Sequence, residues 1–167
     1  VGGYTGQSWL DTILAWQPGG PARPVAHLPQ GVRYAAAAAV DGRLIIAGGT
    51  TPSDGLTDAV LSFDPATGRV TSIGRLPVAL THASAAAIDG QVVIVGGRRQ
   101  LSGDRTATVL GVNPATGKVR ILGHLPQPLS DAGVVQVANR IVVAGGEGSG
   151  GPVTSVVALE PVLSSRG

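Results

Sequence analysis

The chain of 167 residues contains no cysteine, which excludes disulfide frameworks and cysteine-based metal sites from this segment. Aromatic residues are scarce, at 3% of the chain, and no basic run or aromatic–basic stripe is present. Nucleic acid is therefore not an expected partner, and the net charge of +2 describes an ordinary mixed surface. No apolar stretch approaches the roughly 18 residues that a membrane span needs. We expect no metal and no other cofactor.

The residues that are abundant point to short strands and tight turns. Glycine (26 residues), proline (12 residues) and β-branched residues are common, and 43% of the chain is apolar, enough for one domain with a core. Arginine greatly outnumbers the single Lys118, which indicates a GC-rich source. The absence of cysteine fits an exported bacterial protein, as well as many cytosolic ones. We favour an extracytoplasmic location, secreted or at the cell envelope, with any export signal upstream of Val1.

Two dipeptides recur along the chain in a fixed register. Gly-Gly appears at residues 2–3, 48–49, 96–97 and 145–146, at intervals of 46, 48 and 49 residues. Leu-Pro appears at residues 28–29, 76–77 and 125–126, and the spacing to the next Gly-Gly is constant. A period near 48 residues fits a four-stranded unit of about ten residues per strand plus turns.

Each unit predicts four strands. The first covers residues 34–40, 82–88 and 131–137, where small side chains suit an innermost strand. Residues 35–39 are all alanine and favour helix by propensity, but their counterparts 133–137 are β-like, so we predict strand. The second strand is an unbroken apolar run at 44–47, 92–95 and 141–144, which indicates burial on both faces.

The outer two strands carry weaker signals. The third ends near a proline, and Trp16, Phe63, Val112 and Leu159 share one position two residues earlier, so we interpret all four as packing residues. The turns 41–42 and 89–90 are Asp-Gly, a strong hairpin signal, and 138–139 is Ala-Asn, in which Asn is the expected left-handed residue. The fourth strand, 69–73 and 118–122, is more polar and outermost.

The repeat resembles the kelch repeat of bacterial type in three features. One strand ends in Gly-Gly, the next ends near an Asp-Pro turn, and a Leu-Pro crossover leads to an apolar strand followed by Asp-Gly. The resemblance implies an all-β propeller of four-stranded antiparallel blades, about 3.5 of them within residues 1–161, with 162–167 as a tail. Kelch propellers usually close with six or seven blades, so we expect a fragment of a ring of roughly 290–340 residues. The remaining blades would come from the same or another polypeptide.

The sequence departs from the kelch pattern at one position. The arginine commonly found before the innermost strand is replaced by Val32, Leu80 and Leu129. Since such arginines line the pocket in kelch domains that bind acidic peptides, the resemblance does not carry that mode of recognition to this chain.

Ligand contacts are expected in the loops at one end of the blades, because loops vary on a rigid framework. Residues 4–9, 50–57, 98–105 and 147–152 differ from copy to copy. The candidate ligand-binding residues are Trp9, Arg33, Tyr34, His82, Arg98, Arg99, Arg105 and Asp131. For Arg98, Arg99 and Arg105 the alternative is a solvated basic loop whose charge Asp104 partly offsets. The three histidines are not expected to form a metal site, since His27 and His124 occupy the outermost strand in separate blades and His82 stands alone on the other side of its blade.

These features favour a non-catalytic recognition module that binds a protein or a glycan through the loop face. The alternative is a propeller enzyme acting on a sugar, similar to the bacterial sialic-acid epimerase or mutarotase, with Arg33, Tyr34, His82 and Glu147 as acid–base candidates. A purely structural domain is a third possibility. A galactose-oxidase-like copper centre needs a cysteine, which this segment lacks. We predict no catalytic residues.

Overall fold

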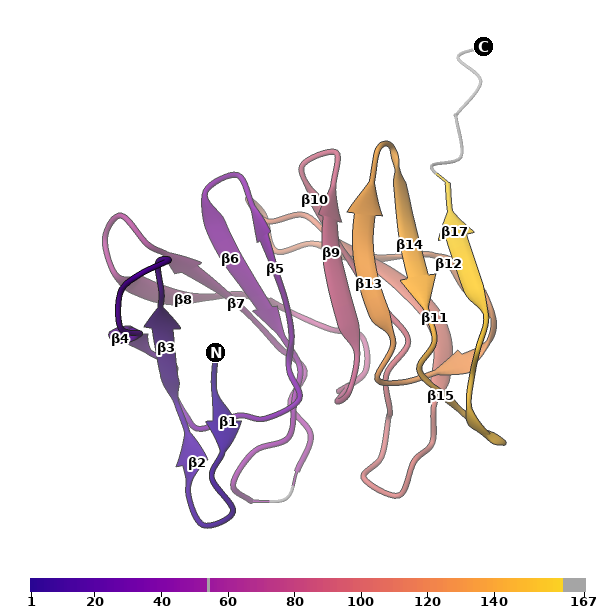
Figure 1. Cartoon of the computed structure of the whole chain (residues 1–167), viewed down its shortest axis with the longest axis horizontal. Coiled ribbons are helices and arrows are strands. Elements are labelled where there is room, and N and C mark those ends of the chain that lie inside the picture. Colours follow the sequence, from indigo (N-terminus) through magenta and orange to yellow (C-terminus); the bar gives the residue numbers. More distant parts are fainter. Residues whose placement is uncertain (54, 161–167) are drawn as a thin grey trace.

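The computed structural model describes residues 1–53 and 55–160, and these form strands, turns and loops without a helix. No helix in these residues is therefore long and apolar enough to cross a membrane. The chain is an all-β propeller segment of antiparallel blades, with about 3.5 blades present. Figure 1 shows the blades side by side in chain order, from indigo to yellow. The expected tail, 162–167, lies outside the described residues.

The second and third blades each contain four strands, and the first and fourth contain fewer. The first blade has β3 (Thr12–Ala15) and β4 (Arg23–His27), preceded by the short hairpin β1 (Gly3–Tyr4) and β2 (Trp9–Leu10). The second has β5 (Ala36–Val40), β6 (Arg43–Ala47), β7 (Ala59–Asp64) and β8 (Arg69–Arg75). The third has β9 (Ser84–Ile88), β10 (Gln91–Val95), β11 (Thr106–Val112) and β12 (Val119–Leu129). The fourth has β13 (Gly133–Val137), β14 (Arg140–Ala144) and β17 (Val156–Leu159), with the hairpin β15 (Glu147–Gly148) and β16 (Gly151–Pro152).

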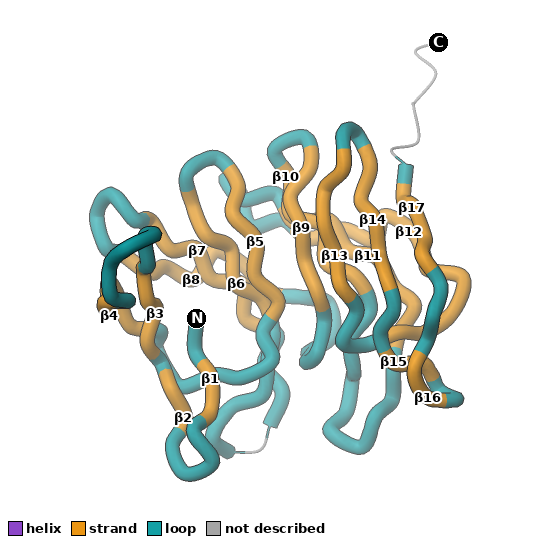
Figure 2. The backbone as a smooth tube through the Cα atoms, in the orientation of Figure 1, coloured by secondary structure: helices purple, strands orange, loops and turns teal. Residues whose placement is uncertain are grey.

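The innermost strands β5, β9 and β13 contact one another in sequence, and each blade runs outward from there in chain order. The tube in Figure 2 shows the strands of each blade joined by tight turns at one end and longer loops at the other. The alanine run forms β5, as predicted, because Ala36 and Ala38 are buried against the third blade while Ala37 and Ala39 are exposed. Tertiary packing therefore overrides helix propensity here.

The hydrophobic core divides into three clusters, one at each interface between neighbouring blades. Ile45 and Ile94, from the second strands of adjacent blades, are each 1% exposed and belong to the same cluster. Burial of such side chains contributes about 1.5–3 kcal/mol each. The prediction that the second strand is covered on both faces is confirmed, since Ile45 and Ile46 belong to different clusters.

The Gly-Gly pairs join each blade to the next. The second glycine of three pairs donates its N–H to a carbonyl of the segment that leads into the following blade: Gly3 to Val32, Gly49 to Leu80 and Gly97 to Leu129, at 2.7–2.8 Å. A Cβ on the first glycine of each pair would overlap the same carbonyl. The glycines are thus required by the close approach of two backbones.

Three details differ from the sequence-based expectations. Trp16 is 64% exposed, whereas Phe63 and Val112 in the same repeat position are buried. No described blade precedes the first one, so no described residue of a preceding blade packs against Trp16. The innermost strands begin two residues later than predicted, at residues 36, 84 and 133. At the 138–139 turn the left-handed residue is Ala138, with φ 52°, and not Asn139.

Candidate functional site

The longer loops gather at one end of the blades, which we call the loop face. Each blade there brings the start of its innermost strand beside the loop that follows its Gly-Gly pair. Two backbone hydrogen bonds join each of the pairs Arg33–Thr50, Thr81–Arg98 and Ser130–Glu147, at 2.7–3.0 Å. The expectation that the two sets of loops share one face is therefore correct.

A second repeat position on the loop face holds a strained backbone. Tyr34, His82 and Asp131 have φ values of 57°, 55° and 58°, in the left-handed region that costs a non-glycine residue about 1–2 kcal/mol. Backbone bonds of 3.0 Å run from His82 N to Tyr34 O and from Asp131 N to His82 O, so the three residues form a row across three blades. Strain of this kind concentrates at functional sites, and it places the three side chains side by side.

The first half of the loop face is aromatic. The guanidinium carbon of Arg33 lies 5.1 Å from the ring centroid of Tyr4, 4.6 Å from that of Trp9 and 5.2 Å from that of Tyr34. The Tyr4 and Trp9 rings are themselves 5.4 Å apart. We call Tyr4, Trp9, Arg33 and Tyr34 the aromatic cluster. Tyr4 and Tyr34 are about half exposed, so the rings are open to solvent.

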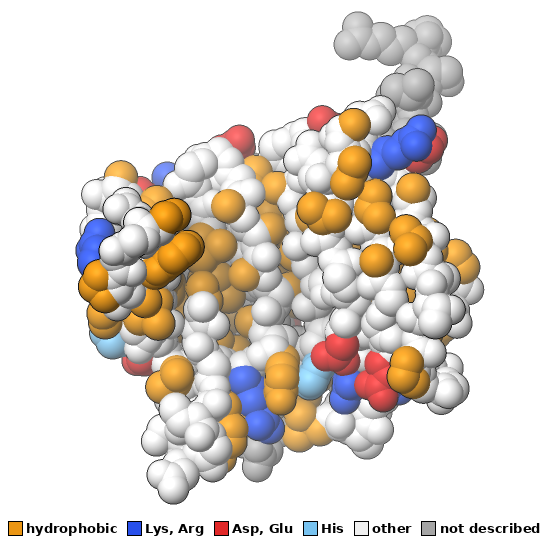
Figure 3. All heavy atoms as spheres, in the orientation of Figure 1, with side chains coloured by type: hydrophobic (Ala, Val, Ile, Leu, Met, Phe, Trp, Pro, Cys, Tyr) orange, Lys and Arg blue, Asp and Glu red, His pale blue; other side chains and the backbone are white. Residues whose placement is uncertain are grey.

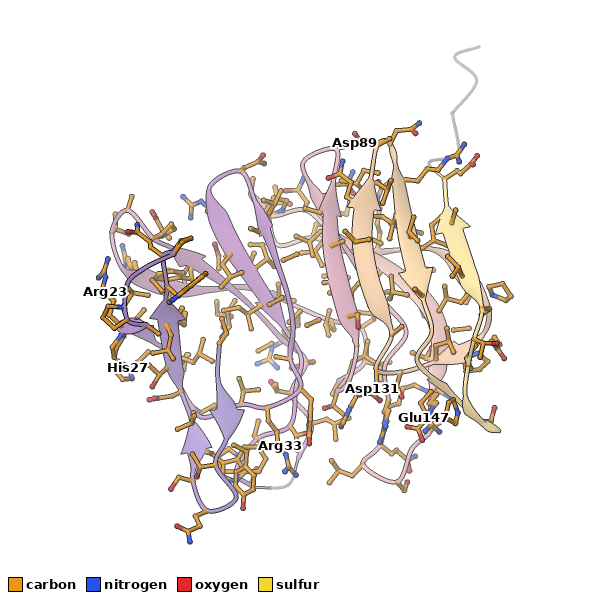
Figure 4. All side chains as sticks on the ribbon, in the orientation of Figure 1. Arg23, His27, Arg33, Asp89, Asp131 and Glu147 are labelled. Atoms are coloured by element: carbon orange, nitrogen blue, oxygen red, sulfur yellow. The ribbon has the colours of Figure 1, made fainter. Side chains whose placement is uncertain are left out.

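The second half of the loop face is charged. Arg98 contacts Asp131 and Glu147, both at 2.7 Å, and Arg105 contacts Glu147 at 2.8 Å. Ser130 accepts hydrogen bonds from the Nε atoms of Arg98 and Arg105 and donates one to Asp131. We call His82, Arg98, Arg105, Ser130, Asp131 and Glu147 the charged cluster. Figure 4 shows Arg33, Asp131 and Glu147 at the same end of the molecule, far from Asp89 at the opposite end.

His82 joins the two clusters. Its ring stacks on that of Tyr34, with centroids 3.8 Å apart and planes at 22°. Its Nδ1 lies 2.6 Å from Asp131. The left-handed backbone and the contact between neighbouring blades place these side chains together, and neither feature is visible in one repeat. The space-filling view in Figure 3 shows basic, acidic and histidine side chains gathered along this edge.

Asp131 is held in its ionised form. Burial opposes ionisation, but hydrogen bonds from His82, Ser130 and Arg98 outweigh it and lower the pKa of the Asp131 carboxyl below its ordinary value. An ionised Asp131 accepts a hydrogen bond from Nδ1 of His82 and so orients the imidazole, as carboxylates do in acid–base pairs. The arrangement fixes the orientation of the imidazole ring.

The basic loop is not uniformly solvated. The side chains of Arg98 and Arg105 are only 19% and 16% exposed, because the acids of the fourth blade cover them. Arg99 fits the alternative of a solvated basic residue whose charge Asp104 offsets: its side chain is 47% exposed and pairs with Asp104 at 3.0 Å. Among the described residues Arg99 has no ion pair or hydrogen bond with either cluster.

Seven of the eight predicted ligand-binding residues therefore lie in the two clusters, and Arg99 does not. Tyr4, Ser130 and Glu147 belong there but were absent from that set. A signal for Glu147 exists in the sequence, since it occupies the repeat position of Arg98 one blade later and carries the opposite charge. In the described part of the chain no group of three His, Asp or Glu side chains is placed to hold a metal ion.

A groove of about 530 Å³ lies away from the loop face, between the third and fourth blades. Ile121, Leu122 and His124 of β12 line it together with Leu159 and Glu160. At the preceding interface the corresponding strand, β8, is covered by the turn at Gly117, which packs against Ile73 and Gly74. Among residues 1–53 and 55–160 no equivalent turn covers the groove, and none of the predicted site residues lines it.

Comparison with known proteins supports the fold and leaves the family open. No family model matches the chain, and no curated protein matches it. Among solved structures, the one titled "Structure of YjhT", a propeller protein, aligns with a TM-score of 0.69 at 17% sequence identity. The alignment covers 86% of this chain and 56% of the other, so this chain spans a little over half the length of that protein.

Proposed function

We propose that the chain is part of a kelch-type propeller that recognises a protein or a glycan through its loop face, without catalysis. The observation that carries the proposal is the aromatic cluster. The chain has only five Trp, Tyr and Phe residues, and three of them surround Arg33 on the loop face. Trp, Tyr and Arg are the residues most enriched at binding hot spots, because they provide contact area with little loss of conformational freedom.

The charged cluster supports recognition over catalysis. A general base needs a pKa near the working pH, yet hydrogen bonds outweigh burial and lower the pKa of Asp131 below its ordinary value, and two arginines contact Glu147. Both carboxylates are therefore committed to internal partners. We infer that this cluster keeps the loop face in shape and that the aromatic cluster meets the ligand.

The two tryptophans provide a matched test. Trp9 belongs to the aromatic cluster, whereas Trp16 follows β3 at the opposite end of its blade and is 64% exposed. We would screen the full chain on arrays of glycans and of extended peptides, then repeat each positive with Trp9→Ala and Trp16→Ala. The proposal predicts loss of binding, by tenfold or more, with Trp9→Ala alone. Equal loss in both variants, or no binding on either array, would contradict it.

A second candidate is acid–base chemistry on a sugar, as in the epimerase or mutarotase alternative. The specific observation in its favour is the 2.6 Å contact between His82 and Asp131, which orients the imidazole. Anomer exchange of sialic acid, followed by NMR with the full chain, tests it directly. Exchange that is accelerated by the native chain and not by His82→Gln would replace the binding proposal.

A further inference from the structure

Arg33 differs from the other arginines of the loop face in having no acidic partner among the described residues. Arg98, Arg99 and Arg105 each lie 2.7–3.0 Å from a carboxylate. Within residues 1–53 and 55–160, Arg33 has neither an ion pair nor a side-chain hydrogen bond, and its Nε is buried without a partner. The terminal nitrogens are also unpaired among the described residues but are not fully buried, so they are the donors that an acceptor from solvent can reach.

The surroundings of Arg33 stabilise its charge without using its hydrogen bonds. Three aromatic rings lie within 5.2 Å of the guanidinium carbon, and each attracts the cation through the electron-rich face of the ring. Guanidinium N–H groups donate in the plane of the group, where a ring offers no carboxylate-like acceptor. The planar fork matches the two oxygens of a carboxylate, sulfate or phosphate.

We propose that the aromatic cluster binds an oxyanion of the ligand, with two ligand oxygens on the terminal nitrogens of Arg33 and the rings against the adjoining apolar part. This rests on the proposed function and names the chemistry of its ligand. A cationic ligand is disfavoured, because Arg33 already occupies the space among the rings and repels a second positive charge. The charged cluster does not compete for the anion, since its arginines are neutralised.

The experiment uses Trp9 as a built-in reporter. The chain has two tryptophans, so Trp16→Phe in the full chain leaves Trp9 alone, 4.6 Å from Arg33. We would titrate this variant with sodium acetate, sulfate and phosphate, against sodium chloride at the same ionic strength. We expect a saturable change in Trp9 fluorescence with at least one oxyanion and none with chloride. The salt that saturates at the lowest concentration identifies the class of oxyanion.

The role of Arg33 is tested in the same background. Arg33→Gln is expected to weaken oxyanion binding about tenfold or more, and Arg33→Lys to weaken it less, because the charge remains and the fork is lost. Arg75→Gln is the matched control: Arg75 lies on the outermost strand β8, is 77% exposed and pairs with Asp58. Its affinity should stay within twofold of the parent. Circular dichroism checks that each variant is folded, and Arg33→Lys serves if Arg33→Gln is not.

Two outcomes would overturn the oxyanion site. One is the lack of a saturable response to all three oxyanions; the other is undiminished affinity in both folded Arg33 variants. Failure here is separable from failure of the proposed function. If Trp9→Ala abolishes binding on the arrays and Arg33→Gln does not, recognition by the aromatic cluster stands and the oxyanion subsite falls.

Discussion

The two halves of the loop face occupy equivalent positions in successive repeats, yet their side chains make different contacts. In the aromatic half, Arg33 contacts rings and no carboxylate among the described residues. In the charged half, Arg98 contacts two carboxylates and a serine. The backbone pairing beneath them is the same. Charges paired with each other join neighbouring blades, whereas Arg33, without an acidic partner among the described residues, is the cation that we propose for ligand binding.

The largest expected contrast between the halves is in stability. Arg98→Ala removes a mostly buried side chain and leaves Asp131, Glu147 and Ser130 short of partners, so we expect a loss of about 2 kcal/mol in the free energy of unfolding. Arg33→Ala removes only contacts with half-exposed rings and should cost less than about 1 kcal/mol. Urea denaturation of the full chain measures both. A larger loss for Arg33→Ala would reverse the assignment of the two halves.

The inter-blade hydroxyl contacts sharpen the comparison at one repeat position. Ser130 joins Arg98, Arg105 and Asp131 and is 2% exposed, whereas Thr81 in the same position has one side-chain partner, Thr50, at 2.9 Å. We expect Ser130→Ala to lower the free energy of unfolding by about 1–2 kcal/mol and Thr81→Val by about 1 kcal/mol or less. Equal losses in urea denaturation would mean that the arginines do not depend on Ser130.

The pH dependence of stability should come from the charged half. The folded pKa of Asp131 lies below its ordinary value, so its contribution is fully present above about pH 4 and is lost as the pH falls through the folded pKa. Asp131→Asn should therefore flatten the dependence of the unfolding free energy on pH from about pH 4 downward. Tyr34→Phe, in the equivalent position of the aromatic half, should leave the slope unchanged. An unaltered slope for Asp131→Asn would exclude Asp131 as the source.

The smallest effect is expected for the arginine that belongs to neither half. Arg99 and Asp104 form a pair whose side chains are 47% and 42% exposed. Exposed pairs are screened by water and salt, so Arg99→Gln should change the free energy of unfolding by no more than about 0.5 kcal/mol. A loss comparable to that of Arg98→Ala would show that the loop is structurally coupled to the charged cluster.

Sequence reasoning predicted the second and third blades well and the edges of the segment less well. The Gly-Gly register located the close contacts between blades, and the contrast of the alanine run with its repeat counterpart predicted β5 correctly. Trp16, which was predicted to pack, is exposed among the described residues, whereas Phe63 and Val112 at the same repeat position pack against the preceding blade. Tyr34, His82 and Asp131 were each predicted as ligand-binding residues, but their stacking and ion pairing were not predicted.

The sequence alone determined the order of the main strands within each blade, since strand periodicity, tight-turn residues and the 48-residue register are local properties of the chain. It also placed most of the candidate binding residues on one face, because equivalent repeat positions occupy equivalent points of each blade. Only the tertiary structure decided which of those residues pair with acidic side chains and which contact aromatic rings. Ion pairs such as Arg98–Asp131 join residues 33 positions apart across two blades, and their formation depends on the distance between blades and on side-chain direction, which the order of residues does not specify.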